Sequence, residues 1–135
     1  MKHLLFSILF IICFTSEISA QKVNFKKGYV LVDNVQVLKY EKEQGGFETN
    51  IFNLEGALVL QILDKKDFDR YFFNTENKII IESTEFDFYT HRQIMQLFFD
   101  KKILNSKGEI NSEKLDEFKS LYDEKITERT IRIDN

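Results

Sequence analysis

The sequence predicts an α+β fold: a largely antiparallel β-meander followed by two C-terminal helices packed on the sheet. In the first half, short apolar segments are separated by turn residues at spacings of about 8–12 residues, which is typical of a meander. Near Thr90 the apolar period changes from two to about 3.6 residues, which indicates helices. Phe and Tyr are abundant whereas Pro is absent, a composition that favours strands and an aromatic core.

The first twenty residues have the features of a secretory signal. Lys2 gives a positive start, Leu4 to Phe14 is almost entirely apolar, and Ile18-Ser19-Ala20 places small residues before Gln21. The apolar run is shorter than the roughly 20 residues that a membrane-spanning helix needs. We therefore expect residues 1–20 to be a cleaved signal peptide and residues 21–135 to form one domain; an uncleaved anchor is the alternative.

Composition argues against several functional classes. The single cysteine, Cys13, lies inside the expected signal, so we expect no disulfide or thiol chemistry after export. The net charge is −3 with both signs interspersed, unlike the basic patch of a nucleic-acid binder. His91 is the only histidine beyond the signal, whereas a zinc site usually takes three or four His or Cys ligands. We expect no metal, no cofactor and no membrane span after cleavage.

The strand-forming segments follow one another along the chain. Asp33-Asn34 suits a two-residue turn, Gly56 suits the left-handed position of a hairpin, and residues 74–77 join the last pair. The nearly continuous apolar stretch from Ala57 to Leu63 predicts a central strand buried on both faces. The predicted strands are residues 29–32, 35–40, 47–52, 57–63, 70–73 and 78–82, with a further edge strand at residues 130–134.

Two helices are expected in the second half. Thr90 and Gln93 fit a capping box at the start of a helix that runs to about Ile103. Gly108 marks a break, and Asn111 is placed to cap a second helix. Its buried stripe is predicted to be Leu115, Phe118, Tyr122 and Ile126.

Aromatic residues provide the candidate binding surface. They could line an apolar cleft or a partner surface, and core packing is the competing explanation. The candidate residues are Tyr71, Phe72, Phe73, Phe86, Phe88 and Tyr89.

Reactive side chains are scarce, so enzymatic chemistry has few candidates. His91 lies near Glu82, Glu85 and Asp87 in sequence and could form an acid–base pair with one of them, although no nucleophile is identifiable. Three acidic residues, at 64, 67 and 69, could hold calcium, but the lysines between them favour an ordinary charged loop. No catalytic residue is assigned.

Several motifs resemble small uncharacterised exported proteins of Bacteroidota. They are Ala20-Gln21 at the cleavage site, Lys27-Gly28-Tyr29-Val30-Leu31-Val32-Asp33, Phe52-Asn53-Leu54-Glu55-Gly56, and the segment from Ile103-Leu104-Asn105 to Phe118. The resemblance implies an envelope or secreted location in a Gram-negative cell. It implies no activity.

The leading hypothesis is a non-enzymatic secreted or periplasmic interaction module that binds another envelope protein or an apolar ligand. One alternative is a small hydrolytic or metal-dependent enzyme that uses His91 with nearby carboxylates. Another is a homo-oligomeric envelope protein whose exposed strand edges pair between chains.

Overall fold

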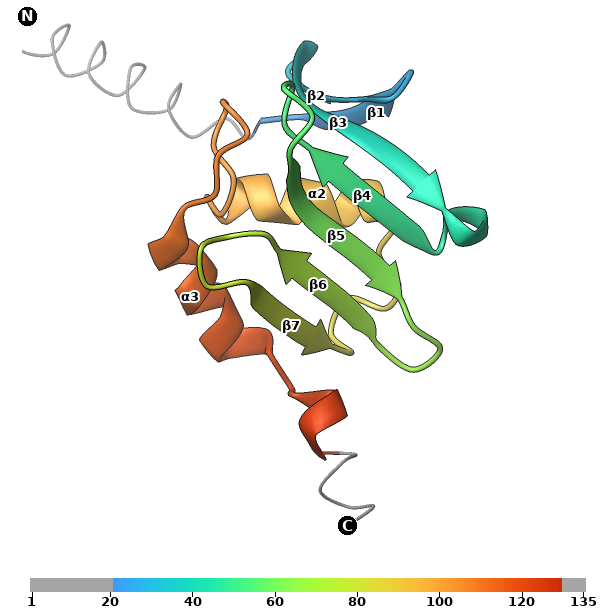
Figure 1. Ribbon diagram of the computed structural model, residues 1–135, viewed down its shortest axis with the longest axis vertical. Helices are drawn as coiled ribbons and strands as arrows, with labels where there is room; N and C mark the ends of the chain where they lie inside the picture. Colours follow the sequence, from blue (N-terminus) through green and yellow to red (C-terminus); the bar gives the residue numbers. More distant parts are fainter. Residues whose placement is uncertain (1–20, 130–135) are drawn as a thin grey trace, which may run out of the picture.

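A seven-stranded antiparallel sheet, with its strands in chain order, forms the body of the molecule (Figure 1). The computed structural model describes residues 21–129, so the expected signal (1–20) and the expected edge strand (130–134) lie outside the described residues. The α+β meander is confirmed. The strands are β1 (Val23–Lys26), β2 (Tyr29–Val32), β3 (Val35–Glu43), β4 (Glu48–Phe52), β5 (Leu58–Asp64), β6 (Asp69–Phe73) and β7 (Ile79–Ser83).

Strand β1 was not predicted from the sequence. It has four residues and only two of them, Val23 and Phe25, are apolar, so its alternation is too short to recognise. It forms a hairpin with β2, in which Lys27 and Gly28 both have positive φ. The Val23 N–H also donates to Oε1 of Gln96 on the first helix, which satisfies part of this edge of the sheet.

The predicted turn residues have the backbone geometry that their types favour. Asp33 and Asn34 have φ values of 52° and 68°, and Gly56 has φ of 94°. Left-handed conformations are least costly for Gly and are tolerated by Asn and Asp. These turns fix the registers between successive strands, for example Val32↔Val35.

Both predicted helices form, and both end earlier than the periodicity suggested. The capping box at Thr90 is confirmed for α2 (His91–Asp100), which stops before Ile103 because Lys102 has φ of 65° and the Ile103 N–H turns back to the Phe98 carbonyl. The predicted cap at Asn111 is confirmed for α3 (Ser112–Tyr122). A 3₁₀ turn, η1 (Gln44–Gly46), separates β3 from β4.

Helix α2 lies behind the sheet in Figure 1, and α3 lies along β7. The core is therefore on one face, where alternate residues of the strands, such as Leu60, Ile62, Tyr71 and Phe73, are fully buried. Ala57–Leu63 is accordingly not buried on both faces, because no helix of residues 21–129 covers the other side: Gln61 and Leu63 remain half-exposed. No helix among residues 21–129 is long and apolar enough to cross a membrane.

Gly108 lies where the turn between the helices meets the sheet. A Cβ there would be 2.6 Å from Leu38 Cδ2 and 3.2 Å from the Val37 carbonyl oxygen, at a φ of +76°. We expect Gly108→Ala to lower the free energy of unfolding by about 2–4 kcal/mol, through left-handed strain and overpacking together. Urea unfolding followed by circular dichroism measures it.

Gly56→Ala is the matched control for this substitution. Gly56 also has positive φ, +94°, but a Cβ would meet nothing within 4 Å. We expect the free energy of unfolding to fall by only about 1–2 kcal/mol, because left-handed strain is present and overpacking is not. Equal losses in the two variants would contradict the packing role of Gly108.

Candidate functional site

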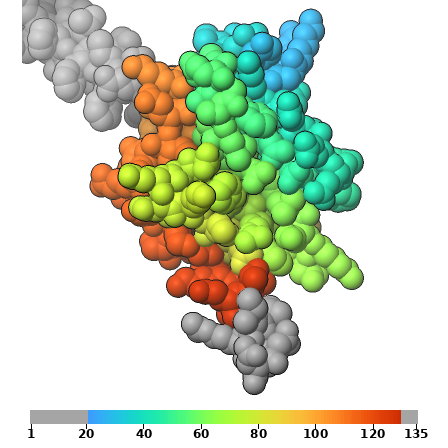
Figure 2. Space-filling view, in the orientation of Figure 1, coloured from blue at the N-terminus to red at the C-terminus, as the bar shows by residue number. Residues whose placement is uncertain are grey.

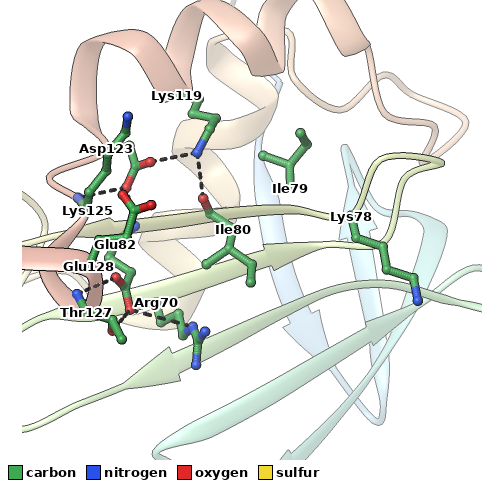
Figure 3. A pocket seen from close by; sticks show the side chains of 10 residues that line it. All are labelled: Arg70, Lys78, Ile79, Ile80, Glu82, Lys119, Asp123, Lys125, Thr127 and Glu128. Carbon is green, nitrogen blue, oxygen red and sulfur yellow. Dashed lines mark hydrogen bonds and ion pairs between the residues drawn. The ribbon is translucent and has the colours of Figure 1, made fainter. Parts of the chain in front are cut away.

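A depression borders the β7 edge of the sheet. Its volume is about 460 Å³, and residues of β6, β7, α3 and the segment after α3 line it (Figure 3). The floor includes Ile79 and Ile80, and the rim carries charged side chains of both signs.

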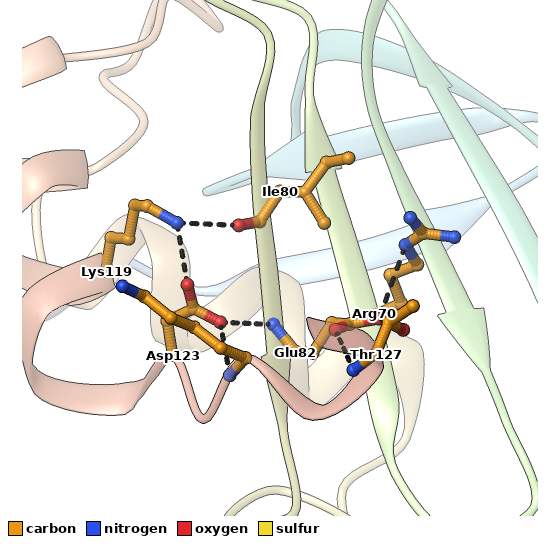
Figure 4. A network of polar contacts seen from close by, with 7 residues as sticks. Arg70, Ile80, Glu82, Lys119, Asp123 and Thr127 are labelled. Atoms are coloured by element: carbon orange, nitrogen blue, oxygen red, sulfur yellow. Dashed lines mark hydrogen bonds and ion pairs between the residues drawn. The ribbon is translucent and has the colours of Figure 1, made fainter. Parts of the chain in front are cut away.

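Asp123, the C-cap residue of α3, ties this helix to β7. Its Oδ1 accepts from the Glu82 N–H at 3.0 Å, and its Oδ2 is 2.6 Å from the ammonium of Lys119 (Figure 4). Lys119 also donates to the Ile80 carbonyl at 2.9 Å. Burial alone would raise the pKa of Asp123, but hydrogen bonds from Lys119 and from the Glu82 and Lys125 N–H groups outweigh it and lower the pKa.

The Glu82 carboxylate is held in the same network. The Thr127 N–H and hydroxyl donate to its two oxygens at 2.9 and 2.6 Å, and Arg70 Nε lies 3.7 Å away. The Glu124 N–H also donates to the Glu82 carbonyl at 2.8 Å. The β7 edge is therefore closed at positions 80 and 82 by the chain itself, so the structure offers no support there for strand pairing between copies.

A second, smaller depression of about 230 Å³ lies on the uncovered face of the sheet, beside the first. It shares Arg70 and Ile80 with the first depression, and Leu63 and Phe72 add apolar surface. In Figure 2 this face is turned toward the viewer. The Arg70 side chain makes no hydrogen bond to the described residues, since its contact with Glu82 is a long ion pair of 3.7 Å.

The six predicted surface residues do not lie together. Tyr71, Phe73 and Phe86 are in the core, so for them the prediction of a binding surface was wrong. The period-two pleat is the reason, because it sends Tyr71 and Phe73 to the helix side and Phe72 to the open side. Phe88 is 99% exposed and Tyr89 44%, on the loop before α2.

His91 is nearly buried and contacts acidic Asp64, which sequence reasoning had not paired with it. Its Nε2 lies 3.0 Å from Asp64 Oδ1, although the directions of the two groups do not make a hydrogen bond. Its Nδ1 lies 2.5 Å from the hydroxyl of Thr49. Glu82, one of the predicted partners, is instead held by Thr127 and Arg70.

Asp69 joins this buried group. It is the register partner of Asp64 and is 4% exposed, and the Tyr71 hydroxyl donates to it at 3.3 Å. Burial, followed by the hydrogen bond to Asp64 and the charges of Asp64 and Asp87, raises the pKa of Asp69 to about 7. Burial, with the negative charge of Asp69, also raises the pKa of Tyr71. We call Thr49, Asp64, Asp69, Tyr71 and His91 the buried acid cluster.

The order hydroxyl–imidazole–carboxylate in Thr49, His91 and Asp64 is that of a nucleophile, base and orienting acid. Thr49, however, is fully buried, and none of the depressions described above is lined by it. A substrate could not reach its hydroxyl in this conformation. Among residues 21–129, no group of three or more His, Cys, Asp or Glu side chains could hold a metal ion.

Comparison of the chain with protein-family models, with curated proteins and with solved structures gives no match. Its functional interpretation therefore depends on the geometry described above.

The role of Asp123 can be tested by Asp123→Asn. We expect the free energy of unfolding at neutral pH to fall by about 1–3 kcal/mol, because the charge-assisted bonds to β7 and Lys119 are weakened. Because the pKa of Asp123 is lowered, its ionised form stabilises the wild-type fold at pH values above the ordinary pKa of 3.8. This stabilisation is lost as the pH falls through the folded-state pKa. Denaturant unfolding at several pH values measures both effects.

Asp116→Asn on the same helix is the control. Asp116 is exposed on α3, and its side chain makes no hydrogen bond or ion pair within residues 21–129, so we expect a change within about 0.5 kcal/mol. A loss in Asp123→Asn that stays constant down to strongly acidic pH would contradict the ionic role of Asp123.

Proposed function

We propose that this protein is a non-enzymatic binding module whose ligand occupies the uncovered sheet face around Arg70, Phe72 and Ile80. The observation that supports it is the depression on the sheet face that neither helix covers, together with the adjoining depression at the β7 edge, which shares Arg70 and Ile80 with it. Phe72, Ile80 and Leu63, which provide the apolar surface of the depression on the uncovered face, lie on the face opposite the core. An apolar surface outside the core is a common place for ligand or partner binding.

The proposed site has an apolar floor. Ile80 and Phe72 are direct register partners on β7 and β6, and Leu63 is the register partner of Arg70 on β5. Ile80 is 37% exposed, and Phe72 and Leu63 are half-exposed. Farther along the row, Gln61 donates to Asn50, so the floor becomes polar toward β4. The apolar part of a ligand would therefore lie over β5–β7.

Cationic side chains border this floor. The Arg70 guanidinium retains hydrogen-bonding capacity, because Thr127 already satisfies the Glu82 carboxylate and leaves only a long ion pair to Arg70. Lys78 points away from the polar network in Figure 3. Arginine binds carboxylates and similar anions in a bidentate manner. We infer that the ligand combines an apolar body with an anionic group.

The site can be tested with two fluorescent probes, anionic anilinonaphthalene sulfonate and uncharged N-phenylnaphthylamine. We expect both to bind the folded protein, and Phe72→Glu to weaken both at least about tenfold because it places a charge on the apolar floor. Arg70→Gln should weaken only the anionic probe. Fluorescence titration gives each dissociation constant.

Leu121→Glu is the control, since Leu121 is an exposed apolar residue of α3 outside both depressions. It should leave both titrations unchanged. If Phe72→Glu binds the probes as wild type does, or if Leu121→Glu loses them equally, the proposed face is not the binding site.

We further infer that the chain is exported and acts in the periplasm or outside the cell. The support is the sequence pattern of residues 1–20: a lysine, an apolar run and small residues before Gln21. Expression of the full chain in a Gram-negative host should give a mature protein that begins at Gln21, in the periplasm or the medium. Intact-mass measurement of each fraction checks it, and a cell-associated protein that keeps Met1 would contradict it.

A further inference from the structure

The buried acid cluster joins four separate parts of the fold. Thr49 is on β4, Asp64 on β5, Asp69 and Tyr71 on β6, and His91 is the first residue of α2. Four of its five side chains, those of Thr49, Asp69, Tyr71 and His91, are at least nine-tenths buried. The cluster therefore lies at the point where the N-terminal turn of α2 is fastened to the sheet.

The two carboxyl groups of the cluster lie close together and have no lysine or arginine partner within residues 21–129. Asp64 and Asp69 are directly opposed on neighbouring antiparallel strands, an arrangement in which like charges destabilise the pair. The other groups that face the pair are His91 from α2, the Tyr71 hydroxyl from β6, neutral Thr49 from β4, and Asp87 from the segment before α2. Among the described residues, no lysine or arginine forms an ion pair with either carboxylate.

We propose that the buried acid cluster is a proton-operated latch, which holds the first residue of α2 and the preceding segment, residues 85–90, firmly on the sheet under mildly acidic conditions and releases them as the pH rises. One proton shared between Asp64 and Asp69 lets the two carboxyl groups bond to each other. Loss of this proton leaves Asp64, Asp69 and Asp87 to repel one another beneath the helix start.

The direction of the pH effect follows from the raised pKa of Asp69. The folded-state value of about 7 exceeds the ordinary value of 3.8, so the folded protein favours the protonated acid. The stabilisation is complete below about pH 4, declines between about pH 4 and about pH 7, and is absent above that range.

The latch would act on a limited part of the molecule. Residue 84 is held independently, because the Thr84 N–H and hydroxyl donate to the Glu124 carboxylate. The capping box of Thr90 and Gln93 is also independent of the acids. Release would thus loosen residues 85–91, which carry the fully exposed Phe88, without melting α2 or the sheet.

Amide hydrogen exchange provides the test. In the wild-type protein, protection of amides 85–91, corrected for intrinsic exchange rates, should fall at least about tenfold between about pH 5 and about pH 8, whereas protection of β4, β5 and the rest of α2 should hold. Asp69→Asn, which keeps the shape and removes the charge, should abolish this fall. Protection that is constant with pH in wild type, or a fall that persists in Asp69→Asn, would overturn the latch.

Glu43→Gln is the matched control. Glu43 and Glu48 form another opposed acid pair between β3 and β4, and Glu43 is exposed. This variant should retain the full wild-type pH dependence, because water screens the exposed pair; a variant that loses the dependence would overturn the assignment to the buried cluster.

A measurement on the wild-type chain makes the test independent of how well the variants fold. The Asp69 carboxyl carbon, followed by nuclear magnetic resonance, should titrate with a midpoint near 7. The half-exposed Asp64 can be changed to Asn, which should move that midpoint down because the neighbouring charge is gone. A wild-type midpoint near the ordinary value of 3.8 would overturn the proposal.

Discussion

The ring of Phe98 connects the sheet to both helices, and the rest of the packing depends on it. From α2 it contacts Tyr71 and Phe73 of β6 edge-on, at centroid distances of 5.5 and 5.2 Å, and it meets Phe118 of α3 at 5.6 Å. Edge-to-face pairs add to the gain from burial. Because one ring makes all these contacts, α2 and α3 must share the same face of the sheet.

One-sided packing determines which surfaces remain for function. The helices leave the opposite face of β5–β7 uncovered, and its apolar residues Phe72 and Ile80 have no layer above them. The β7 edge is different: Lys119 of α3 donates to the Ile80 carbonyl, and the segment after α3 turns back and supplies side-chain and backbone partners at Glu82. A closed edge beside an open face favours ligand binding on the face over strand addition at the edge.

The sequence predicted the features that depend on neighbouring residues. The capping box of Thr90 and Gln93 and the Asp33-Asn34 turn are local, and both form as expected. We did not predict which face of the sheet each aromatic residue of β6 occupies, although the alternation of residues along β6 determines it. The contact of His91 with Asp64 was beyond local reasoning, because it depends on how α2 crosses strands formed far earlier in the chain.

Two pairs of acidic residues lie opposite each other on neighbouring strands. Their difference in burial decides which pair is expected to make the structure depend on pH. Glu43↔Glu48 and Asp64↔Asp69 have the same cross-strand arrangement, and in each pair the neighbouring acid contributes to a raised pKa. Glu43 is in water, where its pair can separate and salt screens it. Asp69 is enclosed beneath the start of α2, so its repulsion from Asp64 can be relieved only by a proton or by movement of the surrounding chain. The same cross-strand arrangement of two acids therefore has little structural effect at the exposed Glu43–Glu48 pair and gives the proposed pH-dependent junction at Asp64–Asp69.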